Sequence, residues 1–230
     1  MSNIITAGNA TNNGTSISSD TSGVLELRTG STPTTALTIG TSGQVGVGST
    51  PSYGTSGQVL TSQGSGAAPV WATASGITSG TAQASTSGTS IDFTGLPAGL
   101  KRITVMFNGV STSGTSFIQF QIGSGSIDTT NYFGAQTQQA SGASGGASGT
   151  SGFGIQSALA ANLIYGHGVF NLLGSNTWTF SFNGATTTGQ AVTLLSAGAK
   201  TLSGTLDRVR ITTVNGTDTF DAGTINILYE

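Results

Sequence analysis

The sequence predicts an all-β protein, with a repetitive N-terminal β shaft that trimerises and a C-terminal antiparallel β-sandwich of jelly-roll type. Two observations lead to this fold class. The 230-residue chain contains 37 glycines and only 6% charged residues, against roughly 25% charged residues and about 7% glycine in ordinary globular domains. Its hydrophobic residues also fall in short runs that alternate with polar ones, which is typical of strands with one buried face. No segment has the periodicity of a helix.

The first 22 residues are polar and rich in glycine, and Ile4, Ile5 and Ile17 are their only large hydrophobic side chains. A segment with so little to bury gains order mainly by contact with another molecule. We interpret residues 1–22 as a tail that attaches the protein to a larger assembly. A frayed chain terminus is the alternative.

Residues 23–88 form the predicted shaft and hinge. The six residues Gly-Thr-Ser-Gly-Gln-Val occur at 40–45 and again at 54–59. Repeats with so few apolar side chains cannot bury a core singly, so they form stacked or intertwined assemblies. Three symmetry-related copies would bring these side chains to a common axis. We expect short strands at residues 24–28, 35–39, 44–47 and 58–61.

Trp71 follows the second repeat and precedes the Gly/Ser/Thr-rich residues 72–88. We interpret it as a packing anchor at the end of the shaft, with a platform for a ligand as the alternative, and we interpret residues 72–88 as a hinge.

Residues 89–230 predict a denser β-domain that is large enough to fold alone. Ile103, Val105 and Phe107 share one face of a predicted strand. Asn215-Gly216 suits a two-residue type I′ hairpin turn. Residues 138–152, rich in Ala, Ser and Gly, predict a flexible loop. The strands are expected at 89–93, 102–110, 116–122, 166–173, 177–183, 191–195, 206–214 and 224–229.

The charge pattern argues against several partners. The six Lys and Arg residues are scattered and the net charge is −2, whereas non-specific nucleic-acid binding needs a basic surface. No apolar run approaches the roughly 20 residues that span a bilayer, so we expect no membrane insertion. The sequence has no cysteine for disulfides. It shows no signal peptide, so we expect assembly in a cytoplasm without export.

The sequence offers no catalytic pattern. His167 is the single histidine, and no nucleophile-elbow motif accompanies it. Asp218 and Asp221 fit a calcium loop or a glycosidase carboxylate pair only loosely, and we interpret them as turn and capping residues. No phosphate-binding loop motif occurs. We therefore expect no enzymatic activity, no metal and no cofactor.

Two parts of the chain carry a resemblance to known proteins. Residues 54–71 (GTSGQVLTSQGSGAAPVW) are similar to the shaft repeat of bacteriophage tail fibres. Residues 91–97 (IDFTGLP), 101–112 (KRITVMFNGVST) and 206–229 (LDRVRITTVNGTDTFDAGTINILY) resemble a domain common at the C-terminal ends of phage fibre proteins. The resemblance implies a virion protein and a homotrimer, fixed to other virion proteins by its N-terminal end. The resemblance fits a tail, neck or head fibre equally.

These observations predict a structural and adhesive fibre of a phage particle, whose distal β-domain binds the host surface, with a host glycan as the ligand. Weak sites repeated on one particle would add avidity. The candidate ligand-binding residues are Tyr132, Phe133, Tyr165 and His167, for which a place in the core or in a trimer interface is the alternative. A capsid decoration protein without a receptor role is the second hypothesis, and a depolymerase is the third.

Overall fold

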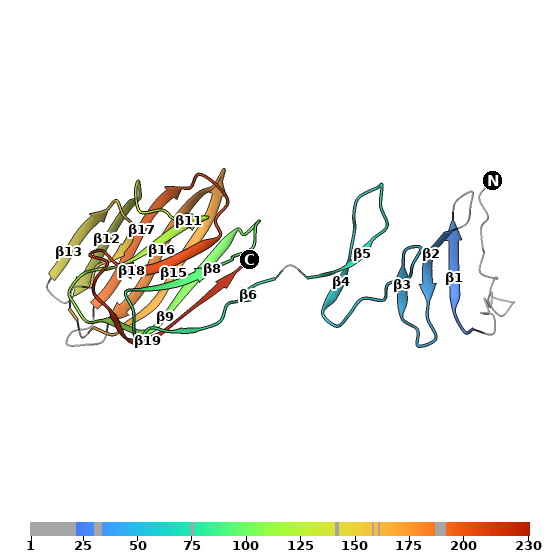
Figure 1. The fold of residues 1–230 in the computed structure, drawn as a ribbon, viewed down its shortest axis with the longest axis horizontal. Helices are drawn as coiled ribbons and strands as arrows, with labels where there is room; N and C mark the ends of the chain where they lie inside the picture. Colours follow the sequence, from blue (N-terminus) through green and yellow to red (C-terminus); the bar gives the residue numbers. More distant parts are fainter. Residues whose placement is uncertain are drawn as a thin grey trace, which may run out of the picture. The chain divides into compact units, whose positions relative to one another are not determined.

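The computed structural model describes residues 22–29, 34–74, 76–140, 143–157, 159–160, 162–186 and 192–230. Within these residues the regular structure consists of β-strands that pair antiparallel, so the all-β prediction is confirmed. The chain divides into two compact units, Met1–Ser75 and Gly76–Glu230; Figure 1 shows the strands of each. The described part contains no helix that is long and apolar enough to cross a membrane. The expected attachment tail lies outside the described residues, apart from Ser22.

The N-terminal unit contains two small sheets. Strands β1 (Leu25–Thr29), β2 (Thr34–Ile39) and β3 (Val45–Val47) form one sheet, and β4 (Gln58–Thr61) pairs with β5 (Val70–Thr73). The predicted strands in this region therefore form, and β5 is an addition to them.

Trp71 of β5 packs within the N-terminal unit. Its indole Nε1 donates a hydrogen bond of 2.8 Å to the carbonyl oxygen of Ser52. Its ring lies so close to Gly54 that a Cβ there would be 2.8 Å from it. Trp71 thus packs against the start of the second repeat and the residues just before it, in agreement with its interpretation as a packing anchor.

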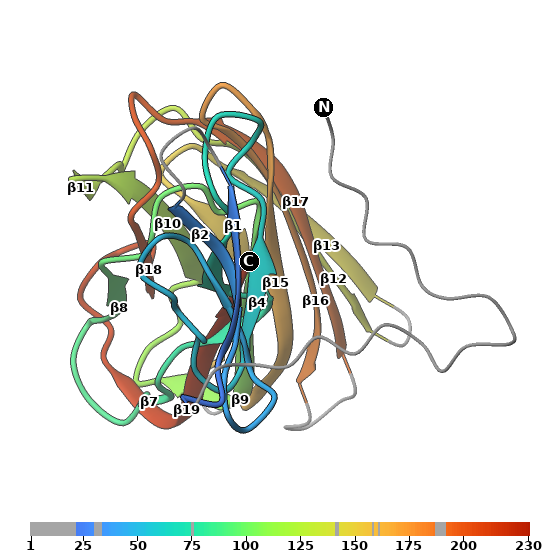
Figure 2. The same ribbon diagram turned by 90° about the vertical axis from the view of Figure 1, so that its right-hand side faces the viewer.

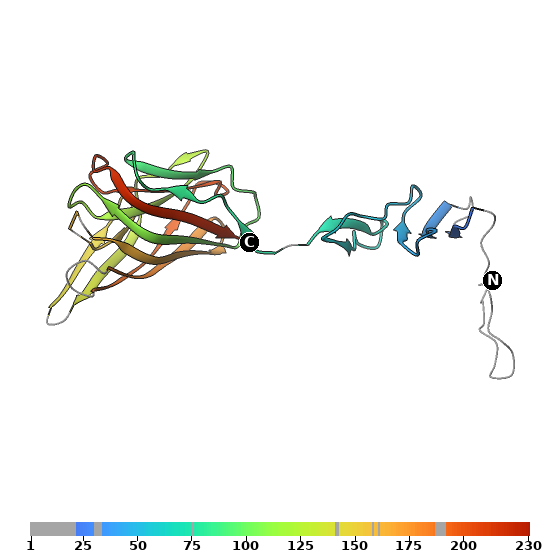
Figure 3. The same cartoon turned by 90° about the horizontal axis from the view of Figure 1, so that it is seen from below.

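The C-terminal unit consists of two antiparallel sheets that face each other (Figures 2 and 3). The smaller sheet has the order β11-β10-β18-β8, and β14 also pairs with β10. Its strands are β8 (Ser90–Thr94), β10 (Ile118–Ser124), β11 (Ser126–Ile127), β14 (Phe153–Ile155) and β18 (Arg208–Thr213).

The larger sheet has the order β13-β12-β17-β16-β15-β9-β19-β6, and β7 also pairs with β19. Its strands are β6 (Thr78–Ser79), β7 (Gln83–Ala84), β9 (Arg102–Thr112), β12 (Phe133–Ala140), β13 (Ala143–Gly149), β15 (Ile164–Gly174), β16 (Thr177–Thr186), β17 (Val192–Thr201) and β19 (Phe220–Tyr229).

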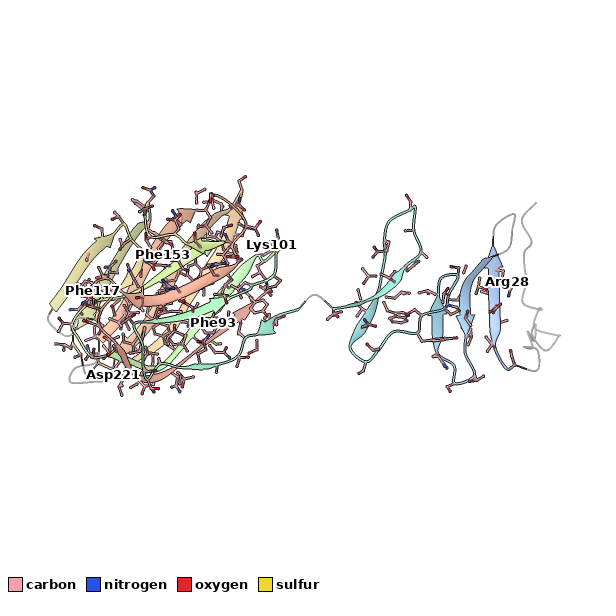
Figure 4. All side chains as sticks on the ribbon, viewed as in Figure 1. Arg28, Phe93, Lys101, Phe117, Phe153 and Asp221 are labelled. Carbon is pink, nitrogen blue, oxygen red and sulfur yellow. The ribbon has the colours of Figure 1, made fainter. Side chains whose placement is uncertain are left out.

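A single hydrophobic core fills the space between the two sheets (Figure 4). Phe120 of β10 is fully buried. Its ring centroid lies 5.0 Å from that of Phe180 and 5.3 Å from that of Phe107, which both belong to the larger sheet. Alternation therefore places one face of each sheet in this core. The other face of the larger sheet faces solvent, whereas on the smaller sheet Gln119 and Gln121, on the other face of β10, are buried as well.

The predicted hairpin at Asn215-Gly216 is wrong. The strands on either side, β18 and β19, lie in different sheets. Gly216 has a positive φ of 69°, but Asn215 has none, so the type I′ turn is not formed. The turn instead carries the chain from one sheet to the other. Ser175-Asn176, between β15 and β16, is a two-residue turn in which both φ values are positive.

The flexible loop predicted at residues 138–152 is also wrong over its described part. β13 pairs with β12 from Gly134↔Gly149 to Ala140↔Ala143. Gly, Ala and Ser have low strand propensity, so the sequence gives no local signal. The ladder forms because β12 offers an open edge, and backbone hydrogen bonds alone can fill it.

The sandwich begins earlier in the chain than the predicted boundary at residue 89. β6 and β7 fall within the segment interpreted as a hinge, yet both pair with β19. Ser85 adds two hydrogen bonds, from its backbone N–H to Gly223 and from its hydroxyl to Ala222. Residues 78–85 are therefore part of the larger sheet's edge.

Candidate functional site

The solvent face of the larger sheet carries three of the four residues predicted to bind a ligand. Phe133 on β12 is 81% exposed and Tyr165 on β15 is 38% exposed. His167 is exposed and lies two positions after Tyr165 on the same face of β15. Phe133 lies three strands away from them across the sheet.

The structure places the fourth residue, Tyr132, in the core instead of on a binding surface. It is 3% exposed, and its ring meets that of Phe153 edge to face at 4.9 Å. Its hydroxyl accepts a hydrogen bond from the N–H of Ile122 and donates one to the carbonyl of Asp128. Burial raises the pKa of this phenol. No ring face is left for a ligand.

A row of side chains runs across four neighbouring strands of the solvent face. His167 of β15 pairs with Asn183 of β16, which pairs with Leu195 of β17, which pairs with Thr137 of β12. Directly opposed residues in a sheet have Cβ atoms about 5 Å apart and project to the same side. The row therefore forms one continuous surface from residues far apart in the sequence.

The next row on this face consists of the small residues Ser181, Ala197 and Ala135, which are also paired across β16, β17 and β12. A hollow of about 550 Å³ opens over these two rows. Small side chains beside larger ones explain it, because the surface drops where the side chains are short. We call this hollow the sheet groove; its lining is Ala135, Gln136, Thr137, His167, Ser181, Phe182, Asn183, Leu195, Ser196 and Ala197.

The polar side chains of the sheet groove are mostly unused by the fold. Among the described residues, the side chains of His167, Ser181 and Asn183 make no hydrogen bond. The hydroxyl of Thr137 donates to the carbonyl of Gly145, 2.7 Å away. None of the lining residues is Asp, Glu, Lys or Arg. The groove can thus give and accept hydrogen bonds without charge.

The described carboxylates are all engaged in structural contacts. Asp92 pairs with Arg210, and Asp207 with Arg208. The remaining contacts are Glu26 with Arg28, Glu230 with Arg102, Asp128 with Lys200, Asp221 with the Ser111 hydroxyl, and Asp218 with Asn215 and Ser116.

Asp218 fastens a turn, as expected. The interpretation of Asp221 as a turn residue is wrong, because Asp221 lies in β19 and accepts a hydrogen bond from the Ser111 hydroxyl of the neighbouring strand β9. The carboxylate of Asp218 accepts hydrogen bonds from the side-chain amide of Asn215 and from the backbone N–H of Ser116. These hydrogen bonds lower the pKa of Asp218, and the bond from Asn215 has the largest effect. No group of His, Asp and Glu side chains in the described ranges is arranged to hold a metal ion.

Comparison with protein-family models, with curated proteins and with solved structures gives no significant match. The evidence on function therefore comes from the residues and the geometry of this chain.

Ser181, Asn183, Leu195 and Thr137 were not among the predicted site residues. The alternation of Trp178, Phe180 and Phe182 already implied that residues 181 and 183 face solvent. The β15–β16 hairpin pairs Asn183 with His167. The sequence contained no signal that β17 and β12 follow β16 in the sheet, and this order brings Leu195 and Thr137 into the row.

Proposed function

We propose that this protein is a structural and adhesive fibre of a bacteriophage particle. Its N-terminal unit forms the trimeric shaft, other virion proteins hold its N-terminal end, and its C-terminal sandwich, of jelly-roll type, meets the host surface. The resemblance of residues 54–71 and 206–229 to phage fibre proteins supports this proposal, as does the neutral, glycine-rich all-β composition.

The poor core of the N-terminal unit is the observation that carries the proposal. In its described residues, Val47 is the only buried hydrophobic side chain. Val59, Leu60 and Val70 of the β4–β5 hairpin are 47%, 46% and 43% exposed. A two-stranded hairpin is at best marginally stable alone in water. Copies of the same chain would bury these side chains, and closed cyclic symmetry is the usual arrangement of such copies.

The C-terminal sandwich has a core of its own and does not depend on other copies of the chain to bury its apolar side chains. Its core contains fully buried aromatic and aliphatic residues, among them Phe120, Phe170 and Ile211. The two units thus differ in the way a shaft and a terminal domain would differ: the shaft depends on association, and the sandwich presents a surface.

Sedimentation of the full chain tests the proposal first, with a trimer as the expected species. Electron microscopy of intact particles, with an antibody against the sandwich, then locates the protein. A projecting appendage is expected. A chain that sediments as a monomer at every concentration contradicts the fibre, and label buried between capsid subunits would support a decoration protein instead.

A further inference from the structure

We propose that the sheet groove binds a neutral oligosaccharide, with Phe133 as an aromatic platform beside it. The inference rests on the proposed function, in which the sandwich contacts a cell surface, and it names the site and the class of ligand. It combines five observations. The groove contains polar side chains that make no hydrogen bond within the described part of the fold, it is lined by no Asp, Glu, Lys or Arg, and the backbone of its strands is paired on both sides. It is also hollowed, and an exposed aromatic ring lies beside it.

The sheet groove differs from two other hollows on the sandwich in the charge of its lining. The first of these, about 340 Å³, contains Arg210, Gln121 and Thr212. All three are occupied, with Asp92, Ser151 and Thr89 respectively. In the second, about 370 Å³, Gln83 donates to the backbone of Asp92. Each of these two hollows also contains a charged residue, Arg210 in the first and Asp92 in the second, whereas the lining of the sheet groove has no Asp, Glu, Lys or Arg.

The chemistry of the groove matches sugar hydroxyls. The amide of Asn183 can donate and accept at once, as can the Ser181 hydroxyl, and the imidazole of His167 adds a further hydrogen-bonding group. Neighbouring hydroxyls on a sugar ring present the same mixture of donors and acceptors. An anionic or cationic ligand would be left without an opposite charge, because no lining residue is acidic or a Lys or Arg.

The backbone of the groove excludes a peptide that binds by strand addition. β17, β16 and β15 are interior strands, with a paired neighbour on each side. Strand addition needs an open edge with free N–H and C=O groups. Recognition over this surface therefore depends on side chains and on shape.

Phe133 extends the surface beyond the groove. It lies two positions before Ala135 on the same face of β12, and at 81% exposure it contributes little to the core. Strands are about 4.8 Å apart and rise about 3.4 Å per residue, so Phe133 and His167 are on the order of 20 Å apart. An aromatic ring suits the apolar face of a sugar. The distance favours a chain of sugars over a single ring.

The unique histidine provides the test. The imidazole signals of His167 in an NMR spectrum of the full-length protein need no assignment by mutation. The probes are cellotetraose, maltotetraose, mannotetraose and chitotetraose, with tetragalacturonic acid as the charged comparison. We expect at least one neutral tetrasaccharide to shift these signals in a saturable way. Its affinity should fall by about tenfold in Asn183→Ala, which loses hydrogen bonds.

Three further variants test the position of the site, and one of them is a control. Ala197→Leu fills the floor of the groove with a side chain on the solvent face, and it should abolish binding without lowering the melting temperature. Leu173→Ala removes a residue of the same sheet that is 76% exposed and is not in the lining, and it should leave binding unchanged. Phe133→Ala should weaken binding of the tetrasaccharide more than that of the matching disaccharide.

Several results would overturn the groove as a saccharide site: no shift with any neutral probe, binding of the acidic probe alone, or full affinity in Ala197→Leu. A shift of His167 on diluting the protein without sugar would also overturn it, because copies of the chain would then cover this face. Sedimentation of the same samples separates the two proposals. A trimer that binds no probe overturns only the groove, and a monomer that binds overturns only the fibre.

Discussion

Lys200 and Asp128 form an ion pair in which Nζ lies 2.7 Å from Oδ2, although the lysine side chain is only 4% exposed. The ammonium group also donates to the carbonyl of Thr130 and lies 5.1 Å from the centroid of the Tyr132 ring. Lys200 belongs to β17, and Asp128 to Tyr132 lead into β12. The pair therefore fastens the start of β12, where Phe133 stands, to the neighbouring strand.

Lys200→Met should lower the free energy of unfolding of the sandwich by about 2 kcal/mol. Breaking a fully buried pair costs more, but Asp128 keeps 33% of its side chain exposed and can be hydrated. Chemical denaturation measures the change. Lys101→Met, at an exposed position, should have almost no effect. Equal stability of the two variants would show that the ion pair adds nothing.

The sandwich should lose stability in acid. Burial opposes ionisation of Asp128, but hydrogen bonds from Lys200 and Thr130 outweigh it and lower the pKa of this carboxyl. The hydrogen bond from Arg208 lowers the pKa of Asp207. A carboxyl with a lower pKa in the folded state stabilises the fold above its unfolded pKa of about 4, and this contribution is lost as the pH falls through the folded pKa.

Melting temperatures between pH 7 and pH 2 measure this acid dependence. The wild type should melt at progressively lower temperature below about pH 5. Asp128→Asn should be less stable at pH 7 and should show a smaller decrease in acid. A decrease as steep as in the wild type would mean that Asp128 is not among the groups responsible.

Two glycines with positive φ should respond differently to alanine. At Gly223 (φ +94°) a Cβ would lie 2.4 Å from the carbonyl oxygen of Gly109, whereas at Gly216 (φ +69°) it would meet nothing within 4 Å. Gly216→Ala should therefore cost only about 1 kcal/mol for its backbone conformation. Gly223→Ala should cost at least about 3 kcal/mol, because backbone must move as well. Denaturation curves that give the same loss for both would refute the steric argument.

The hairpin of the N-terminal unit should control association. Replacing both Val59 and Leu60 by Ser removes the apolar side chains that are expected to lie between copies. The double variant should sediment as smaller species than the wild type, while the calorimetric melting of the sandwich stays unchanged. Leu173→Ser, at an exposed position of the sandwich, is the control and should remain a trimer. An unaltered trimer in the double variant would place the contacts elsewhere.

The sequence by itself determined the features that depend on local pattern. Alternation identified the strands and their buried faces, as for Ile103, Val105 and Phe107, because a period of two fixes which side chains share a face. Composition likewise showed that the predicted shaft, within residues 23–88, has few side chains to bury. The structure agrees with both, in the described residues.

Tertiary structure alone decided which strands are neighbours. The Asn215-Gly216 turn has the sequence of a hairpin, yet it joins the two sheets. The reason is that β18 and β19 bury their apolar side chains from opposite sides of one core. β13 has no strand signal and forms only because β12 offers it an edge. The groove has the same origin: His167, Asn183, Leu195 and Thr137 meet through pairings between strands, and local sequence contains no information about the partner of a strand.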